Sequence, residues 1–258
     1  MKKRQDGFTI VELLVVITII VVLLALLLPS LERAVQSAEI AVCLSNQHKI
    51  GLALHGYQTD HKRYYPVLDT WWGLMGQREA PPPWVVVPSD VTDRPLNAYL
   101  GYTSNGSQVP VARCPSDQGD PLPLVQNDND YRTVGTSYMC AFSPQPQPDG
   151  YVGVKIIFGF SGSNPRLAWV WNIQPLPSEK VTSLERLDNK AVVMDANWHA
   201  DRPTDSPQTR WHRPDRPERY LSTLFGDSHA ELFDWDREFV DTYDVTHRTP
   251  YNSGWKWW

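Results

Sequence analysis

Cysteine is scarce in this chain of 258 residues, which contains only Cys43, Cys114 and Cys140. Their spacing matches neither a CxxC pair nor the ligand pattern of a zinc site, so it indicates neither a redox centre nor a zinc-binding fold. If two of the cysteines form a disulfide, the third keeps a free thiol. The alternative is three unpaired cysteines buried as small hydrophobic side chains.

Clustered positive charge is also lacking. The formal net charge is −5 and the isoelectric point of the sequence is about 5.8. No group of Lys and Arg residues follows the first four residues, so the chain has no basic surface of the kind that binds nucleic acid. We therefore expect no nucleic-acid partner.

Recognisable catalytic motifs are absent as well. The sequence has no HExxH, no GxSxG and no Cys/His pair with an orienting residue nearby. Acidic and histidine residues in the last third of the chain lack the spacing of a metal or nucleophile motif, and we interpret them as surface or turn residues. They are Asp195, His199, Asp201, His212, Asp227 and His229. We expect no enzymatic activity and no cofactor.

One long apolar run lies near the start of the chain. From Phe8 to Leu28 the only polar residues are Thr9, Glu12 and Thr18, and these 21 residues, at about 1.5 Å each in a helix, span roughly the 30 Å hydrocarbon core of a bilayer. We predict a single transmembrane helix over 8–28. A secretory signal peptide is disfavoured because no small-x-small cleavage site ends the run.

Basic residues before this run predict how the chain is oriented. Lys2, Lys3 and Arg4 precede the apolar residues, and positively charged flanks stay in the cytoplasm. We therefore expect an anchor in the cytoplasmic (inner) membrane, with the remainder in the periplasm or at the cell surface.

Glu12 is unusual, because an ionisable side chain inside a membrane segment costs about 3 kcal/mol and calls for a partner. It follows a short basic leader that ends at Gly7, in the sequence Phe8-Thr9-Ile10-Val11-Glu12. This stretch resembles the class III leader of type IV prepilins and of type II secretion pseudopilins.

That resemblance implies a processing route. A prepilin peptidase would remove the leader, residues 1–7, by cutting after Gly7, and would methylate the new amino terminus at Phe8. Glu12 would become the fifth residue of the mature chain, and Pro29 would lie where many pilins carry a helix-bending proline. The Glu12 carboxylate could then neutralise the amine of a neighbouring subunit during assembly, which removes two buried charge costs at once.

Beyond Pro29 we predict that the helix kinks and continues as an amphipathic segment over 29–58, ending near Tyr57. Apolar residues recur there at helical spacing, and such a stripe needs a cover, which we expect a β-sheet to provide. The stripe consists of Leu31, Val35, Ala38, Val42 and Leu52.

The remainder, 59–258, is predicted to form a β-rich globular domain outside the cytoplasm. The chain has 22 prolines and 11 tryptophans, which indicates short strands, many loops and an aromatic core. The predicted fold class is α+β, with a long N-terminal helix packed on an antiparallel β-sheet. Surface loops are expected at Ala80–Pro83 and Ser143–Asp149. Strands are expected at Trp84–Val87, Ala112–Cys114, Ser137–Phe142, Tyr151–Phe160, Leu167–Trp171 and Ala191–Asp195, with a hairpin of Leu221–Phe225 and Ala230–Phe233.

Two blocks resemble a narrower group, the DUF1559-type pilin-like proteins. One runs from Cys43 to Tyr57 with a following Tyr-Tyr-Pro, and the other is Cys-Pro-Ser-Asp at 114–117. Because Cys43 and Cys114 both lie in these blocks, the resemblance favours a Cys43–Cys114 disulfide over Cys114–Cys140.

The end of that group's pattern is not kept. The group often has a histidine, nine residues and then Asp-Gly-His, whereas here fourteen residues separate His212 from Asp227 and Ser228 replaces the glycine. Some pseudopilins hold calcium in a C-terminal loop, so a structural calcium ion is a hypothesis by analogy, with Asp195 and Asp227 as its candidate ligands. We interpret Asn127–Asp130 as a polar turn.

Two functions follow from these patterns. The first is a structural subunit of a type IV pilus or type II secretion-type filament, whose partners are the prepilin peptidase and other pilin-like subunits in a homo- or hetero-filament. The second is a membrane-anchored binding module for glycans or surface partners. Three contacts are open for the aromatic residues of Trp255–Trp258, because exposed aromatic rings invite contact: the domain's own core, another subunit, or a glycan, as the second function requires.

Overall fold

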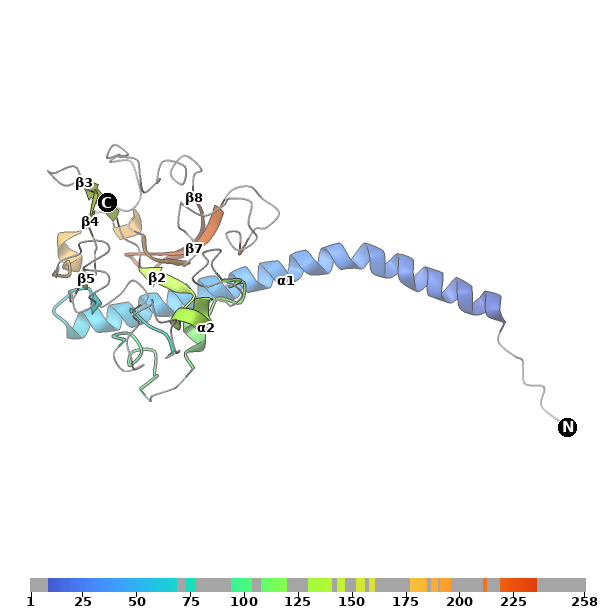
Figure 1. The fold of residues 1–258 in the computed structure, drawn as a ribbon, viewed down its shortest axis with the longest axis horizontal. Coiled ribbons are helices and arrows are strands. Elements are labelled where there is room, and N and C mark those ends of the chain that lie inside the picture. The colour runs from blue at the N-terminus through green and yellow to red at the C-terminus, as the bar shows by residue number, and fades with distance from the viewer. Residues whose placement is uncertain are drawn as a thin grey trace. The chain divides into compact units, whose positions relative to one another are not determined.

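The structure is a computed structural model of the chain (Figure 1). The chain divides into two compact units, Met1–Ala38 and Glu39–Trp258, and we call the second one the globular unit. The structure describes residues 9–68, 73–77, 94–103, 108–119, 130–140, 143–146, 152–155, 158–160, 177–184, 187–189, 191–195, 211–212 and 219–235.

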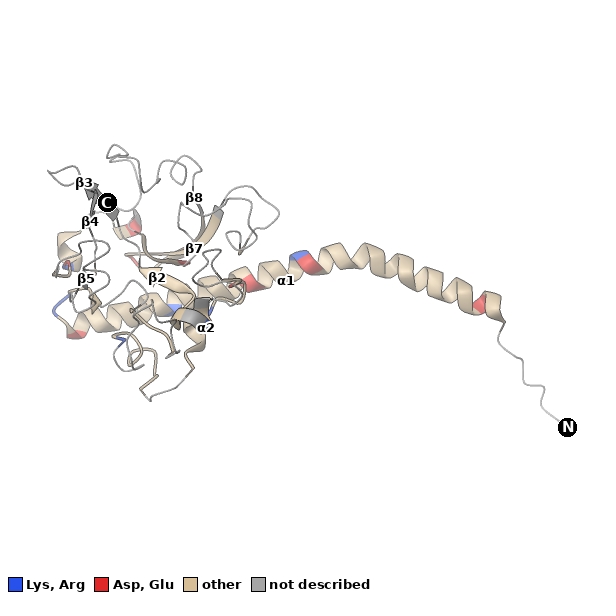
Figure 2. Ribbon diagram, in the orientation of Figure 1, with Lys and Arg blue, Asp and Glu red and all other residues tan. Residues whose placement is uncertain are grey.

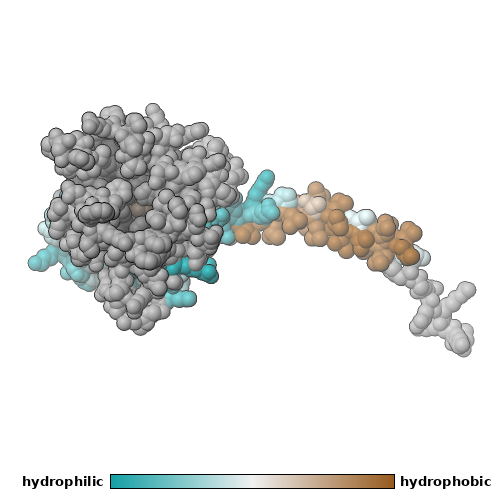
Figure 3. All heavy atoms as spheres, in the orientation of Figure 1, coloured by the Kyte–Doolittle hydropathy of each residue, from teal (hydrophilic) through white to brown (hydrophobic). Residues whose placement is uncertain are grey.

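Helix α1 runs without a break over Ile10–Asp60 and so ends three residues later than predicted. It carries no charged side chain from Leu13 to Leu31 (Figure 2), and Figure 3 shows this part of the helix as largely apolar on the face in view. Pro29 lies inside the helix. Its missing N–H removes one hydrogen bond of the helix but does not end it.

The second half of α1 packs against the globular unit through a face that we did not predict. Leu52, from the expected apolar stripe, is 58% exposed, and Leu31, Val35 and Val42 are exposed as well. The buried residues recur on another side of the helix at spacings of three and four. They are Cys43, Asn46, Gln47, Ile50, Gly51, Ala53, Leu54 and Gln58.

The reason for this error lies in the type of the buried residues. Gln47 is polar by any hydropathy scale, yet it is buried, because its Nε2 donates a hydrogen bond to the Ser222 backbone oxygen at 3.2 Å. Gly51 has no side chain, and a Cβ there would lie only 3.0 Å from Leu224 Cδ1. Hydrogen bonding and close approach, which hydropathy periodicity does not detect, therefore decided which face is covered.

Four antiparallel strands form the main sheet in the order β2-β6-β7-β8, which confirms the α+β class. Their bounds are β2 Tyr138–Cys140, β6 Ala191–Asp195, β7 Arg219–Phe225 and β8 Ala230–Trp235. β6 is buried at every position, as expected for a strand covered on both faces. The predicted strand at 191–195 and the predicted hairpin are confirmed.

Smaller elements surround this sheet (Figure 1). β1 pairs in parallel with β5, and β3 pairs antiparallel with β4. Their bounds are β1 Val67–Leu68, β3 Ser143–Pro146, β4 Val152–Lys155 and β5 Gly159–Phe160, with α2 at Asp130–Val134 and 3-10 turns at Pro110–Ala112, Val181–Ser183 and Leu187–Asn189.

Two local predictions in this region are wrong. No strand forms at Ala112–Cys114. Ala112 instead belongs to a 3-10 turn, because Pro110 at the first position of this turn favours a helical conformation. The expected loop at Ser143–Asp149 contains β3, which reaches Pro146. The expected segments Ala80–Pro83, Trp84–Val87 and Leu167–Trp171 lie outside the described residues.

Candidate functional site

The amino-terminal end of α1 is closed by a reciprocal pair of residues. The Glu12 backbone N–H donates to Thr9 Oγ1 at 3.2 Å. In return, Glu12 Oε2 accepts hydrogen bonds from the Thr9 backbone N–H and from the Thr9 hydroxyl, each at 2.8 Å. This arrangement is a capping box, which satisfies N–H groups that have no partner inside the helix.

The helix that follows presents an apolar surface on all sides. Every residue from Ile10 to Leu28 is exposed, and α1 is long and apolar enough to cross a membrane. The Thr18 hydroxyl donates back to the Leu14 and Val15 carbonyls at 3.1 and 2.8 Å, so it needs no outside partner. An apolar amino-terminal helix suited to membrane anchoring therefore precedes a globular domain. Gly7 and Phe8 lie outside the described residues.

In the globular unit, Cys43 of α1 and Cys114 form a disulfide with a Cα–Cα distance of 5.3 Å. This is the pairing that the narrower family resemblance favoured. Both cysteines are buried. Cys140 in β2 is unpaired, and complete burial raises the pKa of its thiol well above the usual range. The third cysteine is therefore an inert core residue.

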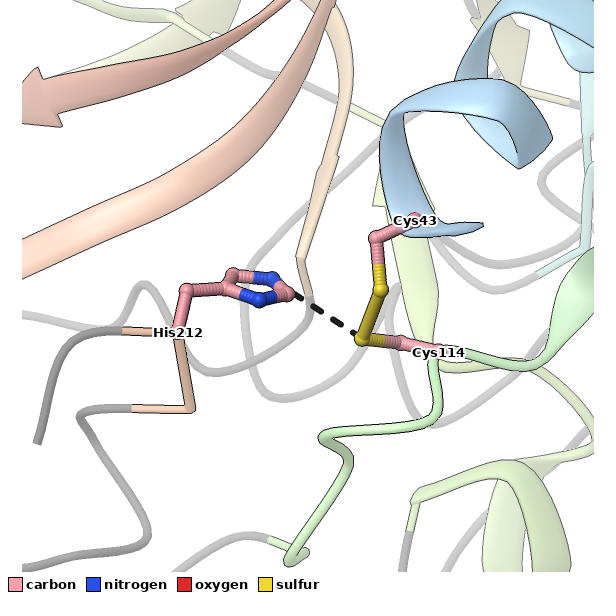
Figure 4. Close-up of side chains that lie close together, drawn as sticks. All are labelled: Cys43, Cys114 and His212. Carbon is pink, nitrogen blue, oxygen red and sulfur yellow. Dashed lines mark hydrogen bonds between the residues drawn. A yellow bond between two sulfur atoms is a disulfide. The ribbon is translucent and has the colours of Figure 1, made fainter. Parts of the chain in front are cut away.

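His212 packs its ring against this disulfide (Figure 4). Its Nε2 lies 3.8 Å from Cys114 Sγ and 2.9 Å from Asp195 Oδ2. His212 and Asp195 are both completely buried. Our interpretation of these two side chains as surface or turn residues is therefore wrong.

Asp195 ends β6 and is held by three donors. The Ser222 backbone N–H donates to Oδ2 at 2.6 Å, and the Ser222 hydroxyl donates to Oδ1 at 2.8 Å. His212 is the third partner. A buried carboxylate needs such partners because it has lost its hydration. Asp195 therefore joins β6, β7 and the segment that carries His212.

Asp117 is a second acidic residue that accepts hydrogen bonds close to the disulfide in sequence. Its Oδ2 accepts from the Tyr131 N–H at 2.9 Å and from the Ser137 hydroxyl at 2.6 Å. The Ser137 oxygen in turn accepts from the Cys114 N–H at 3.0 Å. The Cys-Pro-Ser-Asp block thus has a structural explanation, since Asp117 fixes the backbone that presents Cys114 to α1.

Asp227 and His229 lie in the exposed turn between β7 and β8, as expected. Asp227 Oδ1 accepts from the His229 backbone and lies 2.5 Å from His229 Nδ1. This turn is at the end of β7 that pairs with Ala191. Asp195 lies four residues along β6, which is about 13 Å of strand. The structure therefore does not bring Asp195 and Asp227 together, and the calcium hypothesis stays a prediction.

His199 and Asp201 lie outside the described residues, as do Asn127–Asn129 and Trp255–Trp258. The close approach of Cys43, Cys114 and His212 was missed, because His212 is far from both cysteines in sequence. A sequence signal for it existed: the family resemblance marks both the cysteine blocks and a histidine before the Asp-Gly position. What the resemblance does not give is the direction in which the ring points.

The arrangement at the disulfide does not match a Cys-His-Asp catalytic triad. In a triad the carboxylate orients one ring nitrogen and the nucleophile contacts the other. Here a single nitrogen, Nε2 of His212, faces both Cys114 and Asp195. What the residues share instead is proximity: ligand atoms of Cys43, Cys114 and His212 all lie within 4.8 Å of one another.

Comparison with known protein families found a match at the start of the chain. The family of the prokaryotic N-terminal methylation motif matches residues 2–28. No curated protein and no solved structure matched the chain. The match covers the basic leader, Gly7, Phe8, Glu12 and the apolar run up to Leu28. The chain thus carries a prepilin-type methylation motif at residues 2–28, which supports a type IV pilin-like protein.

Proposed function

We propose that this protein is a non-enzymatic structural subunit of a type IV pilus or type II secretion-type filament. A prepilin peptidase cuts it after Gly7 and methylates Phe8. The mature chain is stored in the cytoplasmic membrane, with its globular domain outside the cytoplasm. It then assembles with other pilin-like subunits.

The observation that carries this proposal is the exposed apolar surface of α1 from Ile10 to Leu28 together with Glu12 at its start. A simple anchor needs the apolar surface but gains nothing from a carboxylate, which is costly in a membrane. In a filament the same surface packs against other helices, and the carboxylate of one subunit neutralises the Phe8 amine of the next.

A second observation supports helix packing beyond the membrane. Leu31, Val35, Val42 and Leu52 remain exposed on α1. Leu31, Val35, Ala38 and Val42 follow the spacing of three and four residues that is typical of helix–helix packing, and Leu52 comes ten residues later. These exposed apolar side chains of α1 are therefore suited to contact a helix of a neighbouring subunit.

The experiment has two parts. Intact-mass analysis of protein from native membranes should find a chain that begins at methylated Phe8, and Gly7→Ala should abolish this form. Sheared surface fractions should contain the protein, and Glu12→Gln should remove it from them without affecting cleavage. Glu32→Gln is the matched control, because it makes the same chemical change on α1 outside the apolar run.

An uncut chain, or one cut beyond Pro29, contradicts the processing route. Normal cleavage combined with unchanged filament recovery in Glu12→Gln contradicts the role of this carboxylate in assembly. A processed chain that never enters a sheared fraction contradicts the filament role and favours an anchored binding module.

A further inference from the structure

We infer that the reduced form of this protein binds one zinc ion through Cys43, Cys114 and His212. These three residues are buried, and their ligand atoms lie within 4.8 Å of one another. Thiolate sulfur and imidazole nitrogen are the ligands that zinc prefers. This site is independent of the filament role.

The distance between Cys114 and His212 already fits the ion. With zinc bonded at about 2.3 Å to sulfur and about 2.0 Å to nitrogen, neighbouring ligands of a tetrahedral site lie about 3.5 Å apart. The observed separation of Cys114 Sγ and His212 Nε2 is 3.8 Å. The two sulfurs must separate, which the reduced chain allows because the disulfide is broken, and His212 Nε2 must exchange its contact with Asp195 for the ion.

The three candidate ligands belong to different segments of the chain, and neighbouring residues hold them in place. Cys43 belongs to α1, while Cys114 follows the 3-10 turn at Pro110–Ala112 and donates its N–H to the Ser137 hydroxyl at 3.0 Å. His212 lies beside Asp195, whose Oδ2 is 2.9 Å from Nε2 and can supply an oxygen for a fourth position. A bound ion would therefore tie the Cys43 turn of α1 to the segments that carry Cys114 and His212, as the disulfide ties Cys43 to Cys114.

The chemistry requires no reductant, because the chain is synthesised with its cysteines as thiols. Zinc binds the two thiolates and the neutral imidazole, and the two thiol protons are released. When an oxidising disulfide later accepts two electrons from the sulfurs, it becomes two thiols. The Cys43–Cys114 bond then forms and the ion leaves. The metal-bound chain would be the precursor of the oxidised one.

The test uses the full chain in detergent, reduced with a phosphine, in a Cys140→Ala background that leaves only the two ligand thiols. Equilibrium dialysis with Zn²⁺ should find one ion per chain, and Co²⁺ should give the absorption of thiolate-bound cobalt. His212→Asn should weaken Zn²⁺ binding at least tenfold. His229→Asn is the matched control, since His229 is exposed in a turn, and it should leave binding unchanged.

The oxidised chain should bind no zinc at this site. Weak, non-stoichiometric binding by the reduced chain overturns the inference. Binding that His212→Asn leaves unchanged overturns it too, because two thiols of an unfolded chain bind zinc without the histidine. Stoichiometric binding that depends on His212 supports it, whether the metal-free reduced chain is folded or unfolded.

Discussion

Glu12 Oε2 lies 2.8 Å from both the backbone nitrogen and the hydroxyl oxygen of Thr9. The carboxylate that the filament proposal assigns to a neighbouring subunit is thus already hydrogen-bonded within its own chain. Thr9 directly follows Phe8, the residue that becomes the amino terminus after cleavage at Gly7. When a subunit docks, Glu12 would therefore give up or share its contacts with Thr9 in order to bind the amine of a neighbouring subunit.

Removing the Thr9 hydroxyl should loosen the start of α1. Thr9→Val keeps the shape of the side chain but removes the acceptor of the Glu12 N–H, and loss of such a cap costs about 1 kcal/mol. Hydrogen exchange of the Glu12 and Leu13 amides in detergent should become about fivefold faster. Thr9→Ser keeps the hydroxyl and should exchange like the wild type. Equal exchange in Thr9→Val and the wild type would show that the box does not hold the helix end.

Breaking the Cys43–Cys114 disulfide should destabilise the globular unit. The bond closes a loop with a sequence separation of 71, and the chain-entropy relation gives about 4 kcal/mol for such a loop. Guanidinium unfolding of a Cys43→Ala, Cys114→Ala variant without added metal should show this loss. Cys140→Ala removes a thiol that is not bridged, so it should cost clearly less. The prediction fails if both variants lose the same stability.

Asp195 should be far more important for stability than Asp227. Asp195→Ala leaves the Ser222 N–H, the Ser222 hydroxyl and His212 without their buried acceptor, which costs about 3 kcal/mol or more. Asp227→Ala removes an exposed contact to His229 and should change stability by less than about 1 kcal/mol. Chemical denaturation of both variants tests this. Similar losses would contradict the structural role of Asp195.

Ser228→Gly should stabilise the hairpin of β7 and β8. Ser228 has φ of 72°, in the left-handed region that costs an L-residue about 1–2 kcal/mol. Glycine relieves this strain, although its unfolded chain has more freedom, so we expect a net gain of about 0.5 kcal/mol. Thermal unfolding measures the change. Ser222→Gly, inside β7, should destabilise the protein instead, and a loss of stability in Ser228→Gly would contradict the argument.

Burial of Tyr65 predicts a loss of stability in alkali. Burial raises the pKa of Tyr65 to about 12, from a usual value near 10. The folded protein therefore holds this proton more tightly than the unfolded chain. The stabilisation is complete below pH 10 and is lost as the pH rises towards 12, by up to about 3 kcal/mol.

The measurement is unfolding by denaturant between pH 9 and about 12. In Tyr65→Phe the free energy of unfolding should fall less steeply with rising pH, because the variant lacks the phenol proton that is lost. Tyr64→Phe is the matched control, since Tyr64 is exposed, and its decline should follow that of the wild type. A Tyr65→Phe variant that declines as steeply as the wild type would show that other groups cause the loss.

Local sequence signals predicted the elements that depend on neighbouring residues. The hairpin of β7 and β8 was found because two short β-like runs flank a turn, and β6 because its apolar residues form a short uninterrupted run. The expected strand at Ala112–Cys114 failed, since Pro110 directs the chain into a turn before it can extend. β3 was missed because its prolines suggest a loop, although they are tolerated where a strand N–H needs no partner.

An apolar amino-terminal helix behind a prepilin-type leader could be predicted from local sequence. Composition over consecutive residues decides whether a segment suits a membrane, and the motif at residues 2–28 is contiguous. Which face of α1 is covered, and the burial of His212 and Asp195 beside the disulfide, depend on long-range packing. Gln47 and Ser222 are 175 residues apart in sequence. Contacts at that separation depend on the packing of the whole domain, which no local pattern encodes.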